Sequence, residues 1–190
     1  MKGNELARGT ARPSFLSRNR ALPHNIWLDS RDPSKGFGGW ALYTTGFKRA
    51  ADELVKHLGE ESSAAHLPEF VAYPIAFLYR HYLELRLKQI LWSTQAATIP
   101  KKHELMVLWR KVLERLKDFH PQDGYFSSDY ERVTQLLRPF DELDPRSEGF
   151  RYPYDGDQLT ISEDIKWMNL HSLREHVDEI SSLLDKLWIS

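Results

Sequence analysis

Three charged residues recur every four positions in the segment Tyr73–Trp92, where they could act together on a ligand. Arg80, Glu84 and Lys88 fall at i, i+4 and i+8, so a helix places them in one polar stripe with His81 beside it. Inside a cleft, the two cations could hold a phosphate while Glu84 orients Arg80. On an open surface, the same stripe is a ladder of ion pairs that each contribute only about 0.3–0.5 kcal/mol.

The segment that carries the stripe has the apolar flanks of a helix at the centre of its domain. Apolar spacing and end signals predict helices at 39–58, 69–93, 103–119, 129–138 and 162–187. About twenty residues without helical periodicity precede the last helix, and their aromatic side chains favour an ordered loop with at most a short hairpin near 150–160. The expected fold is therefore all-α, an antiparallel bundle of about five helices with a long ordered loop before the last one.

The first 35 residues differ from the rest in charge and in periodicity. Residues 1–50 carry nine Lys and Arg against three Asp and Glu, although the whole chain has a net charge of −1. Such a basic segment could contact an acidic partner such as RNA, or it could be a solvated arm. We therefore expect an irregular basic N-terminal arm at 1–35 and a helical bundle domain at 36–190.

Composition excludes several classes of function. The chain has no cysteine, which rules out a thiolate zinc site, a cysteine nucleophile and a disulfide framework. Neither a phosphate-binding glycine loop nor a metal-ligand spacing is present, so no cofactor and no metal are expected. No apolar run approaches the roughly 20 residues that a membrane span needs, and the first residues lack the apolar core of a secretory signal. We therefore expect a cytoplasmic protein with no membrane contact.

Three runs together resemble HEPN-type (higher eukaryotes and prokaryotes nucleotide-binding) helical domains. These runs are FLYRHYLELRLKQIL, KHELMVLW and DPRSEGFRYP, and the resemblance covers about residues 70–185. Domains of this family are antiparallel bundles that often dimerise. Many are metal-independent RNases of toxin–antitoxin and phage-defence systems, and others are non-catalytic binding or partner modules. Catalytic members carry Arg-x4-6-His near the start of the last helix, whereas this chain has Arg174 and His176 there, only two positions apart.

The resemblance also implies a shared polar site between the central helix and the long loop. Its predicted members are Arg80, Glu84, Lys88, His103, Asp144, Ser147, Arg151 and Tyr152. For RNA cleavage, His103 would be the acid–base group, Glu84 would orient it, and Arg80 with Arg151 would stabilise the phosphorane charge. Lys88, Asp144, Ser147, Arg151 and Tyr152 would bind substrate, and the 2′-hydroxyl of RNA would be the nucleophile.

The expected function is RNA or nucleotide binding by a HEPN-like domain of a prokaryotic stress or phage-defence system, with metal-independent endoribonuclease activity left open. The alternative is a non-catalytic structural or regulatory partner module whose Arg/Glu stripe only anchors the long loop. Burial distinguishes the two, because a binding site needs unpaired groups in an open cleft. Expected partners are a second copy, which would meet the first through terminal helices bearing Trp167 and Trp188, and a protein encoded by a neighbouring gene.

Overall fold

The computed structural model describes residues 37–60, 67–94, 98–119, 127–161 and 165–189. The chain divides into two units, Met1–Gly39 and Trp40–Ser190, and the account below concerns the second. The predicted N-terminal arm at 1–35 lies outside the described residues. In the described part of the chain, no helix is both long and apolar enough to cross a bilayer.

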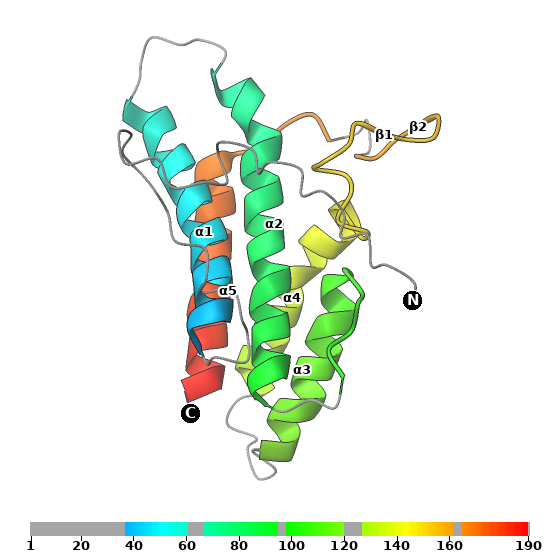
Figure 1. Cartoon of the computed structure of the whole chain (residues 1–190). Coiled ribbons are helices and arrows are strands. Elements are labelled where there is room, and N and C mark those ends of the chain that lie inside the picture. Colours follow the sequence, from blue (N-terminus) through cyan, green and yellow to red (C-terminus); the bar gives the residue numbers. More distant parts are fainter. Residues whose placement is uncertain (1–36, 61–66, 95–97, 120–126, 162–164, 190) are drawn as a thin grey trace, which may run out of the picture. The chain divides into compact units, whose positions relative to one another are not determined.

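Five helices hold most of the residues that the structure describes, which confirms the predicted all-α fold (Figure 1). Their bounds are α1 Phe37–Glu60, α2 Leu67–Ser93, α3 Leu105–Phe119, α4 Ser127–Leu143 and α5 Leu170–Ile189. The loop between α4 and α5 contains an antiparallel hairpin of β1 (Tyr154–Asp155) and β2 (Gln158–Leu159). Gly156 has a φ of 62° in its turn, a conformation that glycine adopts without strain.

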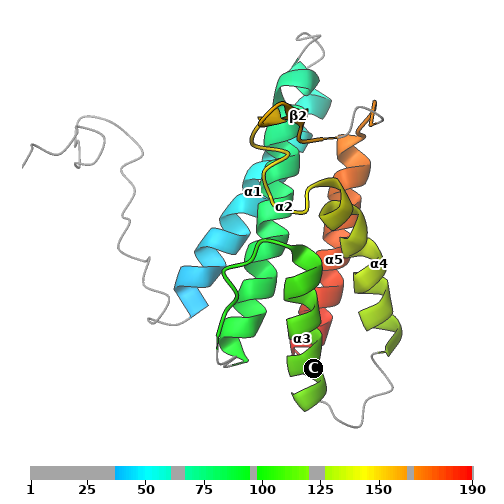
Figure 2. The ribbon, with the colours of Figure 1, turned by 90° about the vertical axis from the view of Figure 1, so that its right-hand side faces the viewer.

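The helices form a ring in which α2 and α4 each pack against both α3 and α5, with α1 beside α2 and α5 (Figures 1 and 2). Neighbouring helices do not all run in opposite directions. Side-chain contacts show that α2 runs parallel to α5, since its residues 82 and 86 meet 181 and 185 in the same order. It also runs parallel to α3, since residues 80 and 94 meet 103 and 115 in the same order. The segment 98–104 runs back beside α2 before α3 begins, which allows the parallel pairing of these two helices (Figure 2).

The core lies between α2 and the other helices. Both flanks of α2 contribute fully buried apolar side chains, as expected for a central helix, and α3 adds Trp109. The Trp109 indole Nε1 donates to the Thr134 hydroxyl of α4 at 2.8 Å, so its one polar atom is satisfied inside the bundle. Each helix therefore buries one apolar side, and α2 buries most of its circumference.

The predicted end of the fourth helix at Arg138–Pro139 is wrong, because α4 continues through Pro139 to Leu143. A proline inside a helix removes one backbone hydrogen bond. Burial of Phe140 in the core offsets that loss, and the Asp141 carboxylate accepts a hydrogen bond from the Leu105 backbone N–H at 2.6 Å. A residue of α4 thereby caps the N-terminus of α3.

The last helix begins later than predicted, at Leu170 and not near 162. Asn169 caps it, since its side-chain oxygen accepts from the Ser172 N–H at 2.9 Å. Ile165 and Met168, expected on the helix, precede it in an irregular segment. Thr160, just before the predicted start at 162, donates its hydroxyl to loop carbonyls, including that of Gly149. Local hydrogen bonding in the loop therefore delays the start of α5.

Candidate functional site

Arg80 is the centre of a buried polar network that joins three segments of the bundle. Its side chain is 0% exposed. Nε donates to the backbone carbonyl of Asp144 at 3.0 Å, and Nη2 donates to the carbonyl of His103 at 2.7 Å. Nη1 lies 3.4 Å from Glu84 Oε2. One guanidinium thus ties α2 to the start of α3 and to the end of α4, using the fork geometry that lysine lacks.

Glu84 contacts the other charged groups of the network, and its side chain is 2% exposed. Its Oε1 accepts from Lys88 Nζ at 2.7 Å and lies 2.9 Å from His103 Nδ1. Burial alone would raise the pKa of this carboxyl, but hydrogen bonds and charges from Lys88 and His103 outweigh burial and lower it. Glu84 is therefore ionised at neutral pH. The burial of Arg80 and Glu84 excludes the interpretation of the stripe as an exposed ladder of ion pairs.

Asp144 opens the long loop and holds its first turn. The carboxylate oxygen Oδ1 accepts the backbone N–H groups of Glu148 at 2.8 Å and Gly149 at 2.9 Å. Oδ2 lies 3.5 Å from Arg80 Nε. Ser147, buried in the same turn, has a φ of 61°, a conformation uncommon for a residue with a side chain. Arg80 and Asp144 together thus fix where the loop leaves the bundle.

Arg151 and Tyr152 are both exposed, outside the buried network. The shared site predicted from the sequence would place Arg151 beside Arg80 and Glu84. Its Nε instead donates to the carbonyl of Ser147 at 2.6 Å within the loop. Its guanidinium carbon lies 5.9 Å from the centre of the Phe77 ring of α2 and 5.5 Å from that of Tyr152. Arg151 therefore does not pair with Glu84, and the loop contacts α2 through stacking of Arg151 on Phe77.

His81 lies between two aromatic rings beside the network. The ring centre of Phe77 is 5.5 Å away in a stacked orientation, and that of Phe47 is 4.5 Å away edge-on. Burial lowers the pKa of this imidazole, which Lys88, Arg80 and Arg151 lower further and Glu84 opposes. His81 is consequently a neutral packing residue at pH 7.

The hairpin loop and α2 enclose a hollow, here called the loop pocket, with a volume of about 420 Å³. Tyr73 lines it from α2, and residues 149–153, 159–161 and 165 line it from the loop side. Tyr73 and Tyr152 are exposed, and Arg151 is the single cation of the lining. Neither Arg80 nor Glu84 lines this hollow, and the buried network is joined to its lining where Asp144 accepts the Gly149 N–H.

Comparison of the chain with known protein families, curated proteins and solved structures gives no match. The HEPN resemblance therefore stays a prediction, and the function rests on the geometry of the site. Among the residues that the structure describes, no three His, Cys, Asp or Glu side chains gather so as to hold a metal ion.

The structure joins six of the eight predicted site residues in one place: Arg80, Glu84, Lys88, His103, Asp144 and Ser147. Arg80 and Glu84 are sealed from solvent, so in this conformation they position other groups and touch no ligand. Lys88 is bound to Glu84, and only the His103 side chain, 54% exposed, is open to a ligand. Sequence reasoning missed Tyr73, Phe77 and the cap Asp141, which carry no motif and act through residues distant in the chain.

Proposed function

We propose that the chain is a non-catalytic HEPN-like binding module that holds a base of RNA or of a nucleotide in the loop pocket. The observation that carries the proposal is the pairing of exposed aromatic faces, Tyr73 and Tyr152, with the Arg151 guanidinium around a hollow of about 420 Å³. Unstacked bases bind proteins by stacking on aromatic rings and arginine planes. Ligand pockets commonly measure about 300–1,000 Å³.

The buried network supports this proposal by explaining how the loop stays in place. The Arg80–Asp144 contacts fix the first turn of the loop, and Arg151 rests on Phe77 of α2. A rigid loop loses little conformational entropy when it binds a ligand, and this favours affinity. The biological setting, a prokaryotic stress or phage-defence system, belongs to the same proposal and rests on the resemblance alone. The homodimer also stays a prediction: Trp167 is exposed but precedes α5, and the Trp188 side chain lies outside the described residues.

Tyr152→Ala and Tyr73→Ala are expected to weaken binding of a labelled single-stranded RNA by about 5-fold to 100-fold, because each removes a stacking face. Fluorescence anisotropy with a ten-nucleotide RNA, and with ATP as competitor, measures the loss. Both side chains are exposed, so the fold should be unchanged. Because the described lining carries one cation, a plot of the logarithm of the association constant against the logarithm of the salt concentration should have a slope near −0.7.

The matched control is Tyr43→Ala, which removes an exposed tyrosine of α1 that does not line the loop pocket. This variant should bind RNA as the unmodified chain does. Equal losses in Tyr43→Ala and Tyr152→Ala, or no RNA or ATP binding at millimolar concentration, would overturn the proposal.

A second candidate is metal-independent RNA cleavage, favoured by the geometry of His103. Its Nδ1 faces the ionised Glu84, and Nε2 has no partner among the described residues. A carboxylate that orients an imidazole in this way is typical of acid–base groups. Arg80, which was expected to stabilise the phosphorane charge, is fully buried and cannot contact a substrate phosphate in this conformation.

If the chain cleaves RNA, His103→Gln should abolish cleavage at unchanged RNA affinity, because only the proton-transfer group is lost. Gel analysis of a labelled RNA in EDTA, with His171→Gln as the exposed-histidine control, tests this. Cleavage that persists in His103→Gln, or that is absent from the unmodified chain, rejects this second candidate and leaves the binding proposal intact.

A further inference from the structure

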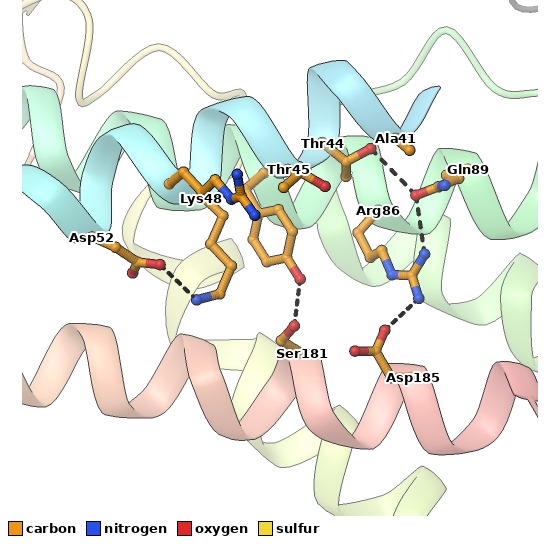
Figure 3. Close-up of a pocket in the computed structure, with 11 residues that line it drawn as sticks. Ala41, Thr44, Thr45, Lys48, Asp52, Arg86, Gln89, Ser181 and Asp185 are labelled. Carbon is orange, nitrogen blue, oxygen red and sulfur yellow. Dashed lines mark hydrogen bonds and ion pairs between the residues drawn. The ribbon is translucent and has the colours of Figure 1, made fainter. Parts of the chain in front are cut away.

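A second hollow lies between α1, α2 and α5, away from the loop pocket, with a volume of about 350 Å³ (Figure 3). We call it the three-helix pocket. None of its lining residues belongs to the predicted site. Charged and polar side chains dominate the lining: Thr44, Thr45, Lys48, Arg49, Asp52, Tyr82, Arg86, Gln89, Ser181 and Asp185.

Most charges of the three-helix pocket are already paired across helices. Lys48 Nζ donates to Asp52 at 3.0 Å, and Arg86 donates to Asp185 (Figure 3). Lys48 Nζ also donates to Asp178 of α5. Burial alone would lower the pKa of Lys48, but these two carboxylates raise it, so the ammonium stays charged. These pairs hold the three helices at a fixed spacing and leave a preformed hollow.

Gln89 offers the pocket an amide with unused hydrogen-bond donors, although the residue is only 4% exposed. Its Oε1 accepts from Arg86 Nη1 at 3.0 Å and lies 3.2 Å from the Thr44 hydroxyl (Figure 3). A guanidinium can only donate hydrogen bonds, so the amide atom of Gln89 that faces Arg86 is the oxygen. The Nε2 group then has no acceptor among the described residues, so its two N–H donors are available to a polar ligand in the pocket.

Arg49 gives the same pocket one unpaired positive charge. It is exposed at the rim and has no carboxylate partner in the described part of the chain. Thr45 lies one helical turn earlier on α1, so its hydroxyl is on the same side of the helix. A guanidinium with a neighbouring hydroxyl suits a phosphate group. The interior, with the Ser181 hydroxyl and the Gln89 amide, suits a ligand that carries hydroxyls.

We propose that the three-helix pocket binds a small phosphorylated polyol of the sugar phosphate class. The phosphate lies against Arg49 and Thr45, and the sugar hydroxyls meet the Gln89 amide and the carboxylate of Asp185. This site is independent of the loop pocket, because the two share no lining residue. The ligand needs no aromatic base, since none of the described residues that line the three-helix pocket presents an exposed ring face.

The test is calorimetric titration of the full chain with ribose 5-phosphate, which carries the phosphate and hydroxyls without a base. One equivalent should bind, and Arg49→Ala should weaken binding about tenfold or more, because a charge-assisted hydrogen bond is lost. Arg49 is exposed, so the variant should fold normally. Gln89→Glu, which exchanges amide donors for a carboxylate, should weaken binding as well.

Arg110→Ala of α3 is the matched control, because it removes an exposed arginine that lines neither pocket. Arg110→Ala and Tyr152→Ala should both bind ribose 5-phosphate unchanged, which separates this site from the proposed RNA site. Ribose alone should bind more weakly and should not respond to Arg49→Ala. The proposal is overturned if ribose 5-phosphate does not bind at about 10 mM, ten times a dissociation constant of about 1 mM. It is also overturned if Arg49→Ala binds ribose 5-phosphate normally, or if inorganic phosphate binds as tightly.

Discussion

Replacement of Arg80 by Met lowers the free energy of unfolding by about 3–5 kcal/mol, the usual cost of removing one partner from a buried ion pair. The loss leaves the carbonyls of Asp144 and His103 without their donor and leaves Glu84 without one of its counter-charges. Urea denaturation followed by circular dichroism measures the change, with the slope of the transition checked for constancy.

Two further variants make the Arg80 experiment specific. Arg110→Met removes an exposed arginine of α3 and should change the stability by no more than about 0.5 kcal/mol. Arg80→Lys keeps the charge but loses the fork that reaches two carbonyls, so its stability should lie between those of Arg80→Met and the unmodified chain. A loss below about 1 kcal/mol in Arg80→Met would show that the network does not anchor the loop.

Glu84→Ala is expected to cost about 3 kcal/mol, because it leaves Arg80 and Lys88 facing each other in a dry site. For a domain of this size, such a loss lowers the melting temperature by roughly 6–12 °C. Thermal denaturation at pH 7 measures it. Glu53→Ala, which removes an exposed carboxylate of α1, should leave the melting temperature nearly unchanged.

The stability difference between the unmodified chain and Glu84→Gln should also depend on pH. Because the folded state lowers the pKa of Glu84 below its ordinary value of 4.5, the carboxylate stabilises the fold fully above that value. The stabilisation is lost as the pH falls through the lower, folded pKa. The two proteins should therefore converge in stability at acid pH, and a difference that stays constant from pH 7 to pH 3 would contradict a buried, ionised Glu84.

Local patterns in the sequence were sufficient to predict the fold class. Apolar residues three and four positions apart determine which side of each helix is buried, and this requires no knowledge of the partner helix. The loop before the last helix was predicted for the same reason, since its residues lack that period. The sequence misplaced the last residue of α4, because Phe140 and Asp141 extend this helix through contacts with other helices. It also misplaced the first residue of α5, because Thr160 forms its hydrogen bonds within the loop.

The spacing of Arg80, Glu84 and Lys88 predicted that they share one side of α2, and it left open whether that side is exposed. The tertiary structure decided this point, because α3 and the end of α4 cover the stripe. Asp144, whose backbone carbonyl accepts a hydrogen bond from Arg80, is 64 positions from Arg80 in the sequence. Local periodicity carries no information about which distant segment covers a helix, since that choice depends on the packing of all five helices at once.

The amino-acid sequence by itself therefore determined the helices, the apolar side of each, and the polar groups available to a site. Only the tertiary structure decided that Arg80 and Glu84 are sealed inside and that Tyr73, Arg151 and Tyr152 face solvent around a pocket. It also decided that Arg49 and Gln89 line a second pocket. The physical reason is that side-chain type and helical spacing are local properties, whereas burial and the enclosure of a cavity arise from contacts between segments far apart in the chain.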